Sequence, residues 1–301
     1  MLRDMARHLI LNRLNNSRCN TISAYLTSHN WSTQFIKRHP YLKGLIVKPI
    51  DQSRVSAYTP EIFQQWFDKF QMHFEKYQPS TSDIYNIDET GFVLGDGEKR
   101  YAILDKRLGI GSTAKAKKGE SLIVIECVSA IGASISPMII YKGKHLQGHW
   151  FDSSAPKDWL VVTSPKGWTS NALGLKWLQY FELATRPQNG GYRFLILDGH
   201  GSHLTPDFQD FCTQYKIVLL CLPPHTSHML QPLDIAVFSP FKHYFRRAIE
   251  RRLQAGALKF PKTEFLETYQ KVRPQALTEK NIKSGFRKAG LVPFNPQKAL
   301  E

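Results

Sequence analysis

Three aspartates in this sequence have the residue type and placement that metal-dependent phosphodiester chemistry requires. Asp88 follows an apolar run in YNIDETG, Asp198 follows another in FLILDGHGSH, and Asp234 lies in LPPHTSHMLQPLDIAVF. Three convergent carboxylates are hard oxygen ligands that suit Mg²⁺ or Mn²⁺. Two such ions about 3.5–4 Å apart can activate an attacking oxygen and stabilise a departing one. Taken singly, an Asp-Gly after a strand is often a turn and an Asp near a helix start is often an N-cap, so the fold must bring the three together.

Two close pairs of histidines lie beside the second and third aspartates. His200 and His203 belong to HGSH, and His225 and His228 belong to PPHTSH. A zinc site would need a third soft ligand, and none is placed with them. Support of the carboxylates and a purely structural role in polar turns both remain open.

The elements that would position these residues follow from the hydrophobic periodicity. Strand-like runs are Ile84–Ile87, Leu122–Val128, Ser136–Tyr141, Arg193–Leu197 and Ile217–Leu222, and helical patterns are Thr169–Ala184, Thr205–Tyr215 and Gln231–Leu253. Three early strands with short links favour an antiparallel meander, whereas the later strand–helix–strand unit requires parallel pairing. The order predicts an α/β fold with a ribonuclease-H-like, mixed five-stranded sheet and flanking helices. In this sheet the first and fourth strands are neighbours, so Asp88 and Asp198 should emerge side by side, and the loop after the fifth strand can return Asp234 to them.

The charge of the chain is unevenly distributed. The 301 residues include 40 Lys and Arg against 25 Asp and Glu, for a formal net charge of +15. Residues 1–50 carry eight basic residues and one acid, residues 242–288 carry thirteen and four, and the centre is nearly neutral. Two basic arms around a neutral body favour a polyanionic partner, nucleic acid first and an anionic membrane surface second.

Several classes of protein are disfavoured by the same sequence. No apolar run reaches the roughly 18 to 20 residues of a membrane span, and the first residues lack the features of a secretory signal. We therefore expect neither an integral membrane protein nor a typical secreted one. The four cysteines lie far apart without a CxxC pair, so reduced thiols are expected rather than a disulfide or zinc framework.

Motifs around the aspartates carry a family resemblance. They are NIDETGF, LDGHGSHLTPDF and LPPHTSHMLQPLDIAVFSPFK, with NIKSGFRKAGLVPFNP near the C-terminus and NWSTQFIKRHPYLKG followed by KPIDQSRVSA upstream. Together they resemble the DDE transposases of the pogo/Tigger branch of the mariner superfamily, especially fungal elements. The 35 residues between Asp198 and Asp234 are similar to that family's second-to-third catalytic gap. The upstream segment resembles the end of its centromere-protein-B-like helix-turn-helix, so the resemblance implies that the chain begins inside that region.

The resemblance implies an RNase-H-like catalytic domain in which Asp88, Asp198 and Asp234 hold two ions, Mg²⁺ or Mn²⁺. It further implies cut-and-paste transposition, a form of DNA recombination, in which element ends are nicked and the freed 3′-hydroxyl attacks target DNA. The partners it implies are double-stranded DNA of the terminal inverted repeats and of the target, with a homodimer on the DNA and location in the nucleus.

The resemblance also divides the chain into regions. These are residues 1–55, a partial helix-turn-helix DNA-binding region; 56–82, a linker helix; 83–253, the catalytic domain; and 254–301, a basic C-terminal helical segment. Residues expected to contact DNA are Trp31, Lys37 and Arg38, on or beside the reading helix, and Lys115, Lys117 and Lys118, in a basic loop whose alternative role is a solvated loop.

Two other functions share parts of this pattern. A domesticated or truncated relative would bind DNA without cutting it. An RNase-H-type hydrolase of RNA–DNA hybrids would share the fold and the metals, although the basic arms and the helix-turn-helix resemblance disfavour it.

Overall fold

The computed structural model describes residues 34, 37–39, 60–94, 121–150, 156–199, 205–255 and 260–299. The chain divides into two compact units, Met1–Asp51 and Gln52–Glu301. In the first unit, Lys37 and Arg38 are helical and exposed, as the expected helix around them requires. The other residues expected to bind DNA (Trp31, Lys115, Lys117 and Lys118) and the histidines His200 and His203 lie outside the described residues. The same is true of Met5–Leu14, whose apolar pattern predicts a helix. The predicted boundaries at residues 55, 82 and 253 stay predictions.

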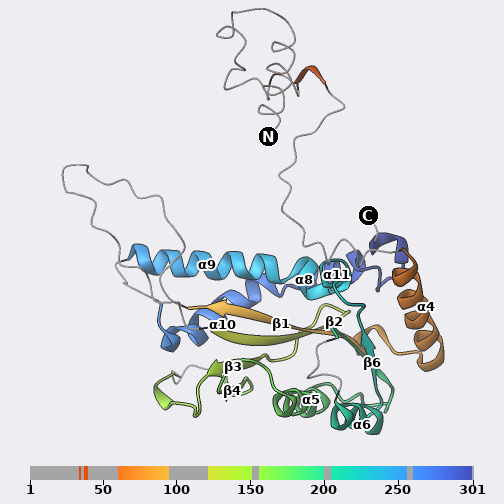
Figure 1. Ribbon diagram of the computed structural model, residues 1–301, viewed down its shortest axis with the longest axis horizontal. Helices are drawn as coiled ribbons and strands as arrows, with labels where there is room; N and C mark the ends of the chain where they lie inside the picture. Colours follow the sequence, from red (N-terminus) through yellow and green to blue (C-terminus); the bar gives the residue numbers. More distant parts are fainter. Residues whose placement is uncertain are drawn as a thin grey trace, which may run out of the picture. The chain divides into compact units, whose positions relative to one another are not determined.

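A mixed six-stranded sheet forms the centre of the second unit (Figure 1). Its strands are β1 (Ile84–Val93), β2 (Ser121–Ser129), β3 (Met138–Lys142), β4 (Leu160–Ser164), β5 (Arg193–Leu197) and β6 (Ile217–Cys221). Their spatial order is β4-β3-β2-β1-β5-β6. The β1–β2 and β2–β3 pairs are antiparallel, and the β1–β5, β5–β6 and β3–β4 pairs are parallel. The predicted α/β fold with a mixed RNase-H-like sheet is therefore confirmed, including the pairing of the strands that carry Asp88 and Asp198.

Two details of the predicted sheet were wrong. The sheet has a sixth strand, β4, a five-residue segment at the sheet edge that pairs in parallel with β3. Strand β1 also does not end before Asp88, because β2 continues to pair with it as far as Val93, opposite Ser121. Asp88 thus lies in the middle of a paired strand, where its backbone is held on one side by β2.

Helices cover both faces of the sheet. They are α4 (Pro60–Tyr77), α5 (Asn171–Thr185), α6 (Pro206–Gln214), α7 (Ser227–Leu230), α8 (Pro232–Ala236), α9 (Phe238–Gln254), α10 (Phe265–Ala276) and α11 (Glu279–Lys288), with 3₁₀ turns η2 (Thr81–Asp83), η4 (Gly148–Trp150), η6 (Lys262–Glu264) and η7 (Pro296–Ala299). Helices α5 and α6 lie against one face and α8 to α11 against the other (Figure 1). Thr205 caps α6 by accepting the N–H of Phe208, and Pro206 occupies its first turn.

The helix expected over Gln231–Leu253 is two helices instead. Helix α8 ends at Ala236 and α9 begins at Phe238. Pro240 explains the break, because it has no N–H to donate to the carbonyl of Ala236 and so cannot continue the same ladder of hydrogen bonds. Proline is tolerated in the first turn of a new helix, where that donor has no partner anyway.

Apolar side chains form one core on each side of the sheet. Helix α4 buries an aromatic stripe of Phe63, Trp66, Phe67 and Phe70 in the same core as α8 to α11. The indole N–H of Trp66 donates to the carbonyl of Cys221 at 2.8 Å, which ties α4 to β6. Among the described residues, no helix is both long and apolar enough to cross a membrane.

A buried ion pair joins α10 to the centre of the sheet. Glu126 of β2 is fully buried and accepts hydrogen bonds from Arg273 Nε at 2.8 Å, from Arg273 Nη2 at 2.9 Å and from the hydroxyl of Tyr269. Arg273 also donates to the carbonyl of Ile135 at 2.6 Å. A buried carboxylate held by this many donors is stable only as long as they are present.

Replacement of Arg273 by leucine should therefore destabilise the protein by about 3–5 kcal/mol, because Glu126 would be left as an unpaired buried charge. Urea unfolding followed by tryptophan fluorescence measures this. The double variant Glu126→Leu/Arg273→Leu should recover most of the loss, since it removes both charges. A single variant as stable as the wild type would contradict the account.

Candidate functional site

The three aspartates reach one region from three elements. Asp88 lies in the middle of β1, Asp198 directly follows the last residue of β5, and Asp234 is the third residue of α8. Because β1 and β5 are parallel and pair Asn86 with Ile196, Asp88 and Asp198 stand two residues further along neighbouring segments. The side chain of Asp234 is exposed, and those of Asp88 and Asp198 are half-buried.

A buried pair of amide side chains holds α8 against the two strands. Asn86 donates through Nδ2 to the carbonyl of Ile196 at 3.1 Å and to Gln231 Oε1 at 2.8 Å, and its Oδ1 accepts the N–H of Leu233 at 3.1 Å. Gln231 Nε2 donates in turn to the carbonyl of Ile87 at 2.8 Å. The N–H of Leu233 belongs to the first turn of α8, where helix geometry supplies no partner. We call this pair the amide clamp; it sets the position of Asp234 relative to Asp88.

Asp88 is electrostatically coupled to both other aspartates. Burial raises the pKa of its carboxyl group well above the ordinary value, and the negative charges of Asp234 and, less strongly, Asp198 raise it further. Hydrogen bonds from the N–H of Glu89, at 2.8 Å, and from Gln231 offset part of this shift. The three carboxylates therefore repel one another within one site, and a divalent cation would relieve that repulsion.

The donor chemistry of the site fits Mg²⁺ or Mn²⁺, because its three acidic groups offer hard oxygen atoms and no thiolate. In the part of the chain that the structure describes, no three His, Cys, Asp or Glu side chains are gathered as a ready-made ligand set. The side chain of Asp198 is half-buried and that of Asp234 is exposed, so both are accessible to a metal ion from solvent.

The second histidine pair lies beside the third aspartate. His225 and His228 are exposed and line a cavity of about 540 Å³ together with Asp234 and the neighbouring Ser227 and Ile235. His225 has a φ of 64°, in the left-handed region that few residues other than glycine adopt. Their position next to Asp234 agrees with the expected supporting role, which stays a prediction.

Other acidic residues near the motifs have different surroundings. Alternation along β1 places Asp88 on the face of Ile84 and Phe92, and Glu89 on the opposite face with Ile87. Asp207 and Asp210 are exposed on α6. Asn86 and Gln231 were not predicted from the sequence, although an amide inside the otherwise apolar run IYNI is a signal that such a side chain needs buried partners.

Helix α11 fixes α8 from the other side. A Cβ atom added to Gly285 would lie 2.5 Å from the carbonyl oxygen of Pro232, which no real Cβ contact allows. Glycine therefore lets the backbones of α11 and α8 approach closely. The C-terminal segment thereby supports the helix that carries Asp234.

Comparison with known proteins gives one family and two curated relatives. Residues 118–286 match the family described as DDE superfamily endonuclease. The chain is 36% identical over 239 residues, 79% of its length, to the MFS-type transporter clz9 of Cochliobolus lunatus, and this match covers 26% of that protein. It is 32% identical over 92 residues, 31% of its length, to the Chaetoglobosin A biosynthesis cluster protein C of Chaetomium globosum, of which the match covers 20%. The chain thus spans about a quarter or less of the curated relatives that it matches.

Solved structures with a similar fold are complexes of the Mos1 mariner transposase. The pre-cleavage Mos1 transpososome matches with a TM-score of 0.54 and 10% identity, over 98% of this chain and 76% of the other. The Mos1 paired-end complex with Mg matches with a TM-score of 0.53 and 12% identity over the same shares. At these identities the likeness shows a shared fold.

Replacement of Asp88 by asparagine should raise stability in metal-free buffer. The pKa of Asp88 in the native state is above the ordinary value of 3.8, so between the two pKa values the native state holds a proton that the unfolded chain has lost. Stability of the wild type therefore falls as the pH rises through this interval, and the variant lacks this contribution. The thermal midpoint of Asp88→Asn in EDTA should exceed that of the wild type by more at pH 8 than at pH 4. A variant that is less stable at both pH values would contradict the electrostatic account.

Replacement of Gly285 by alanine should displace α8 and lower both stability and any activity that needs Asp234. A methyl group this close to a backbone carbonyl forces the two helices apart, at a cost of about 1–3 kcal/mol. Chemical denaturation measures the loss of stability. Gly148→Ala is a matched control, because a Cβ at Gly148 would meet nothing within 4 Å.

Proposed function

The chain belongs to the DDE superfamily endonuclease family, and from this premise we propose that it is a DNA transposase that cuts and joins DNA strands at the ends of a mobile element. The proposal rests mainly on one observation. Asp198, at the end of β5, and Asp234, on α8, both act electrostatically on Asp88 of the neighbouring strand β1 in an RNase-H-like sheet. Within the family we assign the chain to the pogo/Tigger branch of the mariner superfamily, on the motifs that surround these aspartates.

In the proposed reaction, Asp88, Asp198 and Asp234 hold two divalent ions, Mg²⁺ or Mn²⁺. The chemistry that such ions supply is activation of the attacking oxygen and stabilisation of the departing one. The protein's own contribution is to fix the carboxylates. The N–H of Glu89 orients the carboxyl group of Asp88, and the amide clamp keeps α8 at the strand ends. A water would first nick the element end, and the freed 3′-hydroxyl would then attack target DNA.

The substrate that we propose is double-stranded DNA of the terminal inverted repeats and of the target. The basic N-terminal region, residues 1–55, would bind the element ends as a partial centromere-protein-B-like helix-turn-helix. The solved complexes of similar fold are described as Mos1 paired-end complexes, and we propose that this chain likewise acts as a homodimer on DNA. The site of action would be the nucleus.

A second function, binding of DNA without cleavage by a domesticated relative, is favoured by one observation. The described residues do not present a ready-made set of three metal ligands. The two functions differ in whether Asp198 and Asp234 close around a metal when DNA is bound.

Purified protein with Mg²⁺ or Mn²⁺ should nick a supercoiled plasmid that carries the inverted repeats of the element. Asp198→Ala should abolish nicking, because it removes one of the proposed metal ligands, whereas Asp207→Ala should retain it, since Asp207 is an exposed carboxylate on α6. Gel analysis of nicked and linear plasmid measures both. Equal nicking by the Asp198 variant would overturn its assignment, and plasmid binding without metal-dependent cleavage would establish the second function.

A further inference from the structure

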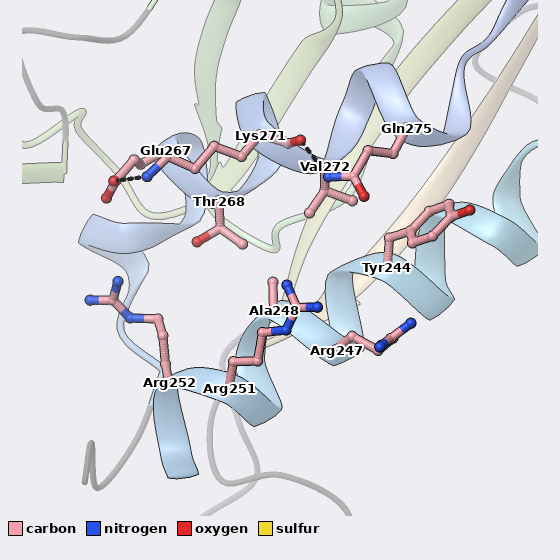
Figure 2. A pocket seen from close by; sticks show the side chains of 10 residues that line it. All are labelled: Tyr244, Arg247, Ala248, Arg251, Arg252, Glu267, Thr268, Lys271, Val272 and Gln275. Atoms are coloured by element: carbon pink, nitrogen blue, oxygen red, sulfur yellow. Dashed lines mark hydrogen bonds and ion pairs between the residues drawn. The ribbon is translucent and has the colours of Figure 1, made fainter. Parts of the chain in front are cut away.

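A groove with a basic rim lies between α9 and α10, separate from the three aspartates. It encloses about 290 Å³. Figure 2 shows Arg247, Arg251 and Arg252 following one another along α9, across from Lys271 on α10. All four side chains are exposed.

The floor of the groove is apolar and firmly supported. Ala248 and Val272 close its base, and both pack against the core. Below them, the rings of Phe241 and Tyr269 lie 4.8 Å apart and those of Phe245 and Phe265 lie 5.4 Å apart, which fixes the spacing of α9 and α10. The rim cations are therefore presented on a rigid frame.

Two of the four cations are already neutralised within the protein. Arg252 forms an ion pair with Glu264, and Lys271 forms one with Glu267. For Arg247 and Arg251, no carboxylate partner is present among the described residues. Arg251 lies in the last turn of α9, where a cation interacts favourably with the helix dipole. Arg247 lies one turn earlier, and like charges four residues apart on a helix repel each other, so its charge gives α9 no such benefit.

The geometry of the two arginines matches a nucleic-acid backbone. One helical turn separates them, about 6 Å along the axis, which is on the scale of the spacing between phosphates along a DNA strand. The guanidinium group binds phosphate oxygens through paired donors. A small phosphorylated ligand would instead require a pocket that buries most of its surface, whereas these arginines are exposed.

We propose that the α9–α10 groove binds the phosphate backbone of duplex DNA through Arg247 and Arg251. The identity of the polyanion rests on the proposed function. Arg251 lies thirteen residues along α9 from its first residue, or about 20 Å of helix, and α9 follows directly after α8 with Asp234. The groove would thus hold the duplex roughly six base pairs away from the reacting phosphodiester, as a grip on the flanking DNA.

The test uses the 301-residue chain, a fluorescent 30-base-pair duplex and EDTA, so that no cleavage occurs. Binding is followed by anisotropy between 50 and 200 mM NaCl. A plot of the logarithm of the DNA association constant against the logarithm of salt concentration has a negative slope. The variant Arg247→Gln/Arg251→Gln should make this slope shallower by about 2, because each lost phosphate contact removes roughly 0.9. At 0.1 M salt its affinity should fall at least tenfold. Its thermal midpoint should match that of the wild type.

A matched control removes two charges elsewhere. Lys176 is exposed on α5, on the other face of the sheet from α9, and Lys166 is exposed in the turn after β4. The variant Lys166→Gln/Lys176→Gln should bind DNA as the wild type does. An equal loss in this control, or an unchanged slope in the arginine variant, would overturn the proposal. Competition by inorganic phosphate at low millimolar concentration at constant ionic strength would also overturn it, in favour of a small-anion site.

The outcome is distinguishable from that of the cleavage assay. If nicking depends on Asp198 but the arginine variant binds DNA normally, the groove proposal fails and the proposed function stands. If the wild type never nicks DNA but the salt dependence of DNA binding is weaker in the arginine variant by the expected amount, the groove proposal is supported and the proposed cleavage function is wrong.

Discussion

The arrangement of the site depends on the hydrogen bonds of one buried amide. Asn86 uses both its donor and its acceptor on three partners: the carbonyl of Ile196 on β5, the side chain of Gln231 at the N-cap of α8, and the N–H of Leu233 in the first turn of α8. An unsatisfied buried polar group costs about 1–3 kcal/mol, so a shift of α8 that broke these bonds would leave several such groups at once. The short helix α8 has too few residues to be stable by itself. Its position is therefore determined by the amide clamp on one side and by Gly285 of α11 on the other.

Two acidic residues that lie opposite each other on β1 and β2 differ in their surroundings: one is paired within the core, and the other belongs to the candidate site. Asp88 and Glu126 are directly opposite in the register of the strands, so their side chains share one face of the sheet. Glu126 is neutralised by Arg273 and serves the packing of α10. Asp88 has instead two further carboxylates within electrostatic range, and its pKa is raised. Uncompensated like charge at a partly buried position is destabilising, and this is typical of sites that are built to receive a ligand.

Periodicity was enough to predict most of the fold, including the neighbouring positions of the strands that lead to Asp88 and Asp198. The pairing of β1 with β5 followed from the order of strands and helices, because short links and crossover helices leave few topologies. Strand β4 was missed because a five-residue edge strand gives little periodic signal, and its pairing with β3 is a tertiary contact. The extension of β1 beyond Asp88 depended on its partner β2 in the same way. The amide clamp could not be derived, since it joins Asn86 to Gln231 across 144 intervening residues; only the buried polar character of Asn86 could be suspected.

The separation of α8 from α9 gives a physical reason why the proposed metal site and the proposed DNA-binding groove could act on the same duplex. Because Pro240 interrupts the ladder of hydrogen bonds, α8 can take the orientation that the amide clamp requires, while α9 follows the sheet on its own aromatic contacts with Phe92 and α10. Helix α9 is then a rigid spacer between the carboxylates and Arg247 and Arg251. A duplex held at a fixed distance from Asp234 loses its freedom to slide before the reacting phosphodiester is positioned, and such prior loss of freedom is a major source of rate in transfer reactions. In the proposed function, the aspartates and the basic α9 therefore have complementary roles. The carboxylates repel a DNA phosphate unless a cation is bound between them, whereas the arginines of α9 bind a phosphate directly.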